Sequence, residues 1–155
     1  MNTTEIVEAL KISLLPKVYV GFELSDAETF FAIFKGRDFI ISRYLLALSH
    51  VQQERSLVDH VTDLRNEIKL KFKTGWFFRE IGLHIILFTE NSSLNEQFTK
   101  VKSDTFGNHA VIIQGIHLVD IRTKSIMNTQ SQWGPLKFGK GRKIDTSLKE
   151  IINNA

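Results

Sequence analysis

Glycines and cations alternate in a short segment near the end of this 155-residue sequence, Gly139-Lys140-Gly141-Arg142-Lys143. Glycines at this spacing let a loop curl so that several backbone N–H groups face one concavity, and the positive end of a following helix would strengthen its potential. A phosphate group fits such a concavity. The sequence therefore predicts an anion-binding loop formed by Lys137, Gly139, Lys140, Gly141, Arg142 and Lys143.

The segment is not a nucleotide-binding P-loop, because the Ser or Thr that must follow the lysine of that motif is missing. Asp145, which we expect to cap the following helix, would also repel an anion there. The alternative interpretation is a solvated loop that binds nothing.

Cations and aromatic rings are interleaved in a second segment that runs from Lys69 to Arg79. This mixture suits neutralisation of a nucleic-acid backbone combined with base stacking. The alternative is that the aromatic residues belong to the core at a junction between a helix and a strand. Additional anion contacts are therefore predicted for Lys69, Lys71, Lys73, Trp76 and Arg79.

Positive charge is concentrated in the C-terminal part of the chain. Residues 69–155 carry 13 Lys and Arg against 7 Asp and Glu, whereas the whole chain has a net charge of only +3. Such a half attracts nucleic acid or an acidic protein surface. The alternative is that these cations are ordinary solvated faces.

Histidines and acidic residues fall at helix-compatible spacings in two places, His50 with Glu54 and His60 with Asp63. Each pair could supply two metal ligands, but a tight site needs three or four. We therefore expect no metal site and no cofactor.

His117 and Asp120 leave an enzymatic alternative open, because an acidic residue on a strand beside a hairpin can hold Mg²⁺ in metal-dependent nucleases. Asp104 could supply a first acid, but Arg122 and Thr123 replace the rest of the pattern. We expect no catalytic residue, and His117 and Asp120 could equally belong to the core.

An apolar stripe at spacings of four, three and four residues is formed by Leu57, Val61, Leu64 and Ile68. A stripe of this kind packs on the protein's own sheet or on a partner helix. A second alternative function is therefore an accessory protein that forms a homodimer or binds another protein through this stripe or through the Trp76–Phe78 cluster.

Periodicity and capping residues predict the elements that must position these groups. Helices are expected over Thr4–Leu14, Ser25–Gly36, Asp38–Val51, Ser56–Ile68 and Ser93–Val101, and from Asp145 onward. Strands are expected over Val18–Phe22, Trp76–Arg79, Leu83–Thr89 and Ala110–Arg122 with a bend at Gly115, and then, after a hairpin tip at Thr123-Lys124, over Ile126-Met127.

The fold class that follows is α+β. We expect a single domain over residues 1–155 with a mixed, mostly antiparallel sheet of about four to five strands flanked by helices. The expected order of elements is α-β-α-α-α-β-β-α-β-β-α, and strand order within the sheet does not follow from the sequence.

The composition and the N-terminal residues limit the chemistry and the cellular compartment that we expect for the protein. The chain has no Cys, which excludes disulfides, thiolate catalysis and Cys-ligated zinc. An acidic N-terminus without an apolar core predicts no signal peptide, and no segment approaches the roughly 20 apolar residues of a membrane span. We expect a cytoplasmic, non-catalytic binding module whose basic half engages nucleic acid or an acidic protein surface, with no membrane partner. A metal-assisted hydrolase or nuclease and a homodimeric accessory protein are the alternatives.

Overall fold

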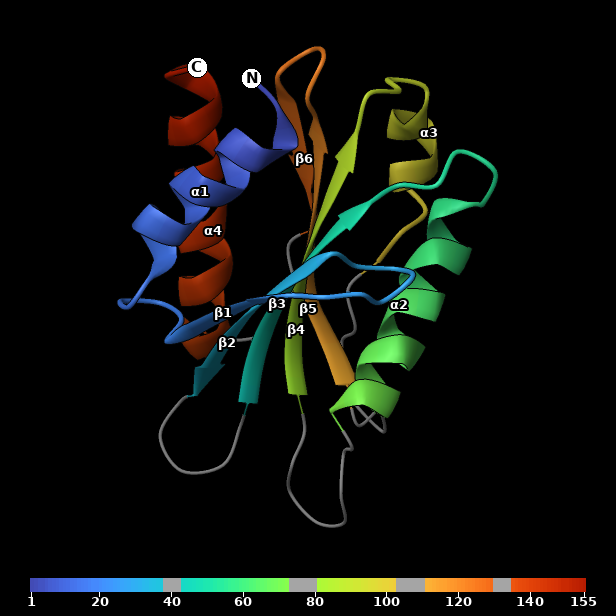
Figure 1. The fold of residues 1–155 in the computed structure, drawn as a ribbon. Helices are drawn as coiled ribbons and strands as arrows, with labels where there is room; N and C mark the ends of the chain where they lie inside the picture. The colour runs from blue at the N-terminus through green and yellow to red at the C-terminus, as the bar shows by residue number, and fades with distance from the viewer. Residues whose placement is uncertain (38–42, 73–80, 103–110, 130–134) are drawn as a thin grey trace.

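The computed structural model describes residues 1–37, 43–72, 81–102, 111–129 and 135–155. Within these ranges it contains four helices and one six-stranded sheet (Figure 1). The helices are α1 (Thr3–Leu14), α2 (Leu57–Lys71), α3 (Leu94–Phe98) and α4 (Pro135–Asn153). The strands are β1 (Gly21–Leu24), β2 (Ala32–Arg37), β3 (Arg43–His50), β4 (Ile81–Thr89), β5 (Val111–Asp120) and β6 (Ser125–Asn128).

The strands lie in the sheet in the same order as in the chain. β1, β2 and β3 form an antiparallel meander, β3, β4 and β5 are parallel, and β6 returns antiparallel to β5. Between β4 and β5 the register passes from Leu83↔Ile113 to His84↔Gly115, so that Gln114 is an extra residue. The bend that the sequence predicts at Gly115 is thereby confirmed as a β-bulge.

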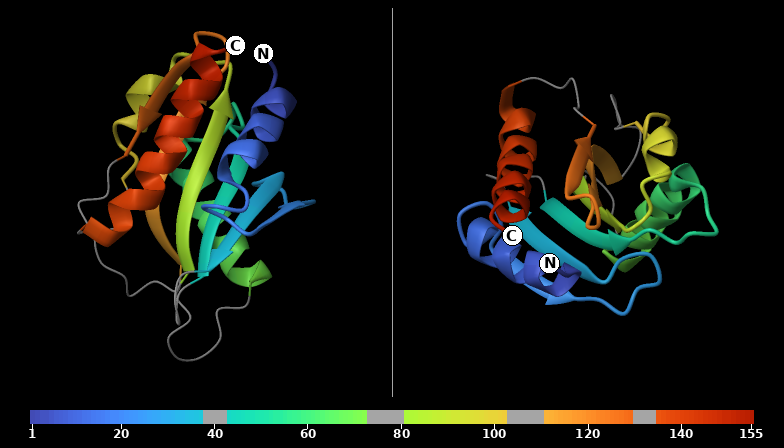
Figure 2. Two further views of the ribbon diagram at one scale, coloured as in Figure 1. Left: turned by 90° about the vertical axis from the view of Figure 1, so that its left-hand side faces the viewer. Right: turned by 90° about the horizontal axis from the view of Figure 1, so that it is seen from above.

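Helices cover both faces of the sheet, with α1 and α4 side by side on one face and α2 and α3 on the other (Figure 2). The strands supply alternate residues to the two resulting cores. On β4, Leu83 and Ile85 face α2, whereas Ile86 and Phe88 face α1 and α4. Burial on both faces explains why β4 is an almost unbroken apolar run.

Several predicted elements are confirmed. In α1, the Asn2 side chain accepts a hydrogen bond from Glu5 N at 2.9 Å, and Glu5 accepts one from Asn2 N at 2.8 Å. In α2, Ser56 caps the helix by accepting from Asp59 N at 3.2 Å. The hairpin tip lies at Thr123-Lys124 as expected, and Lys124 adopts a positive φ of 56° there.

The two helices predicted from Ser25 to Val51 are wrong, because this stretch forms the loop before β2 and the strands β2 and β3. Ser25 Oγ accepts from Ala27 N at 3.1 Å, which makes a local turn and not a helix cap. β3 is buried on both faces, and an apolar run of this kind has no periodicity that separates strand from helix.

The mixed α+β class flanked by helices is confirmed, but its details differ. The described residues hold six strands instead of four to five, and the three central ones are parallel, so the mostly antiparallel description misses the middle of the sheet. The element order is α-β-β-β-α-β-α-β-β-α. The extended segment predicted at Trp76–Arg79 lies outside the described residues.

The last helix begins at Pro135 and not near Asp145 as predicted. Proline is well suited to the first helical position, where its missing N–H leaves no hydrogen bond unmade. The segment from Gly139 to Lys143 is therefore helical, which corrects the predicted loop. Among the described helices, none combines the length and apolar character needed to cross a membrane.

Candidate functional site beneath helix α4

Two histidines stand on neighbouring parallel strands, His84 on β4 and His117 on β5. Both side chains lie on the face covered by α1 and α4, and their ring centroids are 6.1 Å apart. They are almost completely buried, with exposed fractions of 2% and 3%. The sequence placed them on predicted strands but gave no sign that they would meet, because strand order was unknown.

Two glycines make the space that the His84 ring occupies. A Cβ atom at Gly115 would lie 2.8 Å from His84 Nδ1, and one at Gly141 would lie 3.4 Å from His84 Cε1. The ring therefore lies between the bulge of β5 and the helix α4. A glycine inside a helix costs about 1 kcal/mol relative to alanine. At Gly141 a Cβ atom would make only an ordinary contact with the ring, which shows how close α4 lies to His84.

Lys140 lies beside the histidines on the first turns of α4. Its ammonium Nζ is 3.4 Å from the centroid of the Tyr44 ring on β3 and 5.9 Å from that of Tyr19. These distances are those of a cation–π interaction, which holds the lysine against the start of β3. Gln114 lies near the Tyr44 ring, on either side of Gly82. A Cβ atom at Gly82 would be 2.8 Å from both Gln114 Oε1 and Tyr44 Cδ1.

Both histidines are neutral at pH 7. Burial, with smaller contributions from the neighbouring His117 and Lys140, lowers the pKa of His84 to about 3. Burial also lowers the pKa of His117 to about 4, where the carboxylate of Asp145 acts in the opposite direction and Lys149 adds to the lowering. Desolvation dominates in each case.

The rings of His84 and His117 have four nitrogen atoms, and none has a hydrogen-bond partner among the described residues. A neutral imidazole offers one N–H donor and one acceptor nitrogen. Leaving a buried group of this kind unpaired costs about 1–3 kcal/mol. The two rings, together with Lys140, can therefore donate to and accept from a bound polar group.

Asp145 and Asn128 border the His117 side of this cluster. Asn128 Nδ2 donates to Asp145 Oδ1 at 2.8 Å, and Lys149 Nζ donates to Asp145 Oδ2 at 2.6 Å. Burial alone would raise the pKa of Asp145, but these hydrogen bonds outweigh it and the pKa is lowered. Asp145 is therefore a partly buried carboxylate within α4 and not the helix cap that the sequence predicts.

The basic residues of the two predicted segments lie on helices that cover opposite faces of the sheet. Arg142 and Lys143 are exposed on α4, and Lys69 and Lys71 are exposed on the last turns of α2. Lys137 and Gly139 belong to α4, but nothing is described of their surroundings, and Lys73, Trp76 and Arg79 lie outside the described residues.

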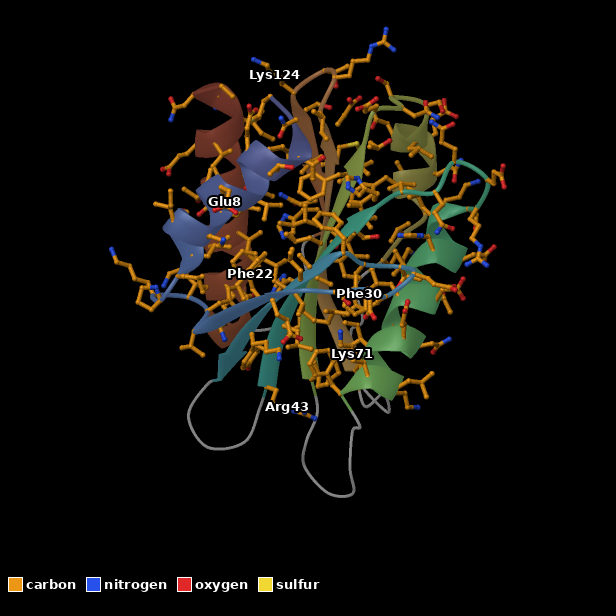
Figure 3. All side chains as sticks on the ribbon, in the orientation of Figure 1. Glu8, Phe22, Phe30, Arg43, Lys71 and Lys124 are labelled. Atoms are coloured by element: carbon orange, nitrogen blue, oxygen red, sulfur yellow. The ribbon has the colours of Figure 1, made fainter. Side chains whose placement is uncertain are left out.

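Both helices nevertheless contact the start of β3, each from its own face of the sheet. Arg43 donates from Nη1 to the Phe72 carbonyl at the end of α2 at 3.2 Å, whereas its neighbour Tyr44 lies beneath Lys140 of α4. Successive strand residues point to opposite faces, so β3 contacts both helices here. Figure 3 shows Arg43 and Lys71 at this end of the molecule and Lys124 at the other.

Arg43 was missed by the sequence analysis because the segment around it was predicted to be helical. Its neighbour Lys71 donates to Ser25 Oγ at 3.0 Å and lies 5.5 Å from the Phe30 ring centroid. We group Arg43 with the exposed cations of the two helices that contact the start of β3, and call these residues the basic end of the sheet: Arg43, Lys69, Lys71, Arg142 and Lys143.

The apolar stripe of α2 is part of the protein's own core. Leu57, Val61, Leu64 and Ile68 are all buried against β3, β4 and β5. The interpretation of this stripe as a partner or dimer surface is therefore wrong. The Trp76–Phe78 cluster lies outside the described residues.

His117 and Asp120 do not form a joint site. They are three residues apart on β5 and so point to opposite faces, and Asp120 accepts hydrogen bonds from Ser92 Oγ, Arg122 N and Thr123 N at 2.8, 2.9 and 3.1 Å. These bonds fix the β5–β6 turn. The two side chains therefore cannot act together in the way that the hydrolase alternative requires. Asp104 lies outside the described residues, within which no group of three potential metal ligands occurs.

A serine–histidine contact on the other face was not expected from the sequence. Ser49 Oγ and His60 Nε2 are 2.7 Å apart, an arrangement that in enzymes activates a nucleophile. Both side chains are fully buried between β3 and α2, and Ser49 also donates to the Thr29 carbonyl. Burial lowers the pKa of His60, as does Arg55, while Asp63 opposes the shift. This pair holds the loop before β2 to the core.

Comparisons with known proteins give no relative. No protein-family model matches the chain, and no curated protein or solved structure matches it either. The function must therefore be argued from the geometry of the chain itself.

Proposed function

We propose that this protein is a non-catalytic module that binds the phosphate backbone of nucleic acid at the basic end of the sheet. The observation that carries the proposal is that two cation-bearing helices, α2 and α4, both contact the first residues of β3. Lysine and arginine side chains that neutralise phosphates supply most of the affinity of such modules.

The charge distribution supports an anionic partner. Residues 69–155, which include the last turns of α2 and all of α4, carry 13 Lys and Arg against 7 Asp and Glu. Arg142 and Lys143 are exposed on α4, so a phosphate group can reach them without any rearrangement of the core. The end of α4 that begins at Pro135 adds the positive end of its helix dipole.

The competing interpretation is that Lys69 and Lys71 only complement the negative C-terminal end of α2. The contacts of Lys71 with Ser25 and Phe30 suit that role. Arg142 and Lys143 do not share it, because they lie in the middle of α4, more than one turn from either end of the helix, where the helix dipole has little effect. Their presence there favours a role in binding.

The test is fluorescence anisotropy of labelled single- and double-stranded DNA and RNA with the full chain at about 50 and about 200 mM salt. We expect binding that weakens steeply with salt. The double variant Arg142→Gln/Lys143→Gln should bind at least about fivefold more weakly and lower the slope of log K against log salt by about 2.

The matched control is Lys124→Gln, which neutralises an exposed lysine at the opposite end of the molecule (Figure 3). This variant should bind almost as the unmodified chain does. Equal losses in the two variants would show that binding follows net charge and not the basic end. No binding to any of the polymers at the lower salt concentration contradicts the proposal and favours an acidic protein surface as the partner.

A further inference from the structure

The buried cluster beneath α4 is not needed for a surface that contacts a nucleic-acid backbone. His84 and His117 are 2% and 3% exposed, whereas backbone phosphates meet exposed side chains. Their four ring nitrogens have no partner among the described residues. We propose that His84, His117 and Lys140 form a buried binding site for a single small oxyanion of the phosphate class.

The chemistry of the three side chains favours an oxyanion. Each neutral imidazole has an N–H group that can donate to an anionic oxygen, and Lys140 brings a positive charge from α4. A protonated phosphate oxygen can in turn donate to the acceptor nitrogen of a ring. The 6.1 Å between the ring centroids leaves the two rings side by side and not stacked on each other.

A metal ion fits the same cluster less well. Two histidines supply only two ligands, and the described residues hold no group of three potential ligands. The charge of Lys140 reaches His84, as its effect on the pKa of that ring shows, and it opposes a cation there. A buried water molecule is the remaining occupant that two polar rings could hold.

The glycines on either side of His84 also have a role in such a site. A Cβ atom at Gly115 would lie 2.8 Å from the His84 ring and would force a shift, whereas one at Gly141 would make an ordinary contact with the ring at 3.4 Å. The helix that bears Lys140 therefore lies close to the sheet. The site thus depends on β4, β5 and α4 together, and it is distinct from the exposed residues Arg142 and Lys143.

The experiment is a titration of the ¹⁵N-labelled full chain with inorganic phosphate, followed through the imidazole nitrogens in long-range ¹H–¹⁵N spectra at constant ionic strength. We expect saturable shifts of the His84 and His117 resonances. His60, buried on the opposite face, and His50, exposed at the far end of β3, are internal controls that should not move. A nucleoside monophosphate, titrated separately, tells whether the phosphoryl group is accepted free or as part of a nucleotide.

Two variants separate the buried site from the surface. Lys140→Met keeps the aliphatic stem over Tyr44 but removes the charge, and it should weaken phosphate binding about tenfold or more while the histidine resonances stay in place. Arg142→Gln/Lys143→Gln should retain phosphate binding at the histidines even though it weakens nucleic-acid binding. The two proposals can therefore fail independently.

The absence of saturable histidine shifts with both phosphate compounds overturns the inference, and so do equal shifts at His50 and His60. Shifts that appear only with Zn²⁺ would assign the cluster to a metal instead. If phosphate shifts the two rings equally in the unmodified chain and in Lys140→Met, the lysine has no part in the site and the proposed ligand set is wrong.

Discussion

At the scale of single residues, the site beneath α4 depends on glycines as well as on polar side chains. His84 fills the space that a side chain at Gly115 would need, and its ring also lies next to Gly141. The sequence showed Gly141 only as one glycine of a basic segment. Its partner is a histidine 57 positions away in the chain, and no local pattern points to such a contact.

Substitution of Gly115 tests this packing directly. In Gly115→Ala the new methyl group would lie 2.8 Å from His84 Nδ1, so the ring or the bulge must shift, and we expect a loss of about 1–3 kcal/mol in the free energy of unfolding. Urea denaturation measures it. The control is Gly21→Ala, whose methyl group would meet its nearest neighbour, Lys35 Cβ, at an ordinary 3.9 Å. Equal stability of Gly115→Ala and the unmodified chain would contradict the account of His84.

At the scale of elements, the apolar stripe of α2 illustrates what periodicity can and cannot settle. The spacing of Leu57, Val61, Leu64 and Ile68 identified the helix and its apolar face correctly. It did not tell whether that face meets the protein's own sheet or a partner. The sheet itself decides this, because β3, β4 and β5 present a matching apolar face to α2.

Because the stripe belongs to the core, truncating two different leucines of α2 should have very different effects on the free energy of unfolding. Leu64→Ala removes a fully buried side chain and should lower the free energy of unfolding by about 2–5 kcal/mol. Leu70→Ala, on the same helix but 78% exposed, should change it by no more than about 0.5 kcal/mol. Urea denaturation of both variants checks the prediction. If Leu64→Ala leaves the stability unchanged but disrupts a dimer that the unmodified chain forms in sedimentation, the stripe is a partner surface and this prediction is wrong.

Helices with a regular apolar period were predictable from the sequence, whereas the continuous apolar run of β3 and the turn at Ser25 were not. Asn2 and Ser56 begin helices whose apolar faces repeat regularly, and both helices are found near their predicted bounds. β3 failed because its residues are buried on both faces, so its apolar run matches a strand and a helix equally well. In α4, Gly139 and Gly141 indicated a loop, whereas the structure has a helix there in which Gly141 lies next to His84.

At the scale of the whole molecule, the candidate site could not be assembled in advance because it depends on strand order. Lys140 was predicted as an anion-binding residue, but His84, His117 and Tyr44 come from three other elements. They meet only because β3, β4 and β5 are adjacent and parallel and because α4 crosses back over them. Long-range pairings of this kind carry no signature in a single sequence.

Burial of two neutral histidines makes the stability of the whole fold depend on pH. The folded-state pKa values of about 3 for His84 and about 4 for His117 lie below the ordinary 6.5, so the unfolded chain binds protons first as the pH falls. The free energy of unfolding should therefore fall below about pH 6.5, by up to about 1.4 kcal/mol per pH unit for each histidine. Asp120 and Asp145, whose pKa values are lowered from 3.8, add little above pH 5.

Urea denaturation between about pH 7.5 and about pH 5 measures the contribution of the histidines, because the carboxylates stay ionised there. His60, whose pKa burial also lowers, adds to the slope, so variants are needed to separate the residues. The His117→Asn variant should lose part of the slope below pH 6.5. Burial also lowers the pKa of His50, but this side chain is exposed, so His50→Gln should keep most of the slope.

If phosphate occupies the proposed site, adding it should stabilise the folded state of the unmodified chain. By favouring protonated rings, phosphate should also flatten the pH dependence of the free energy of unfolding in the unmodified chain but not in Lys140→Met. A slope that is identical in the unmodified chain and in His117→Asn would mean that His117 is not held neutral in the core, and the buried site would lose one of its members.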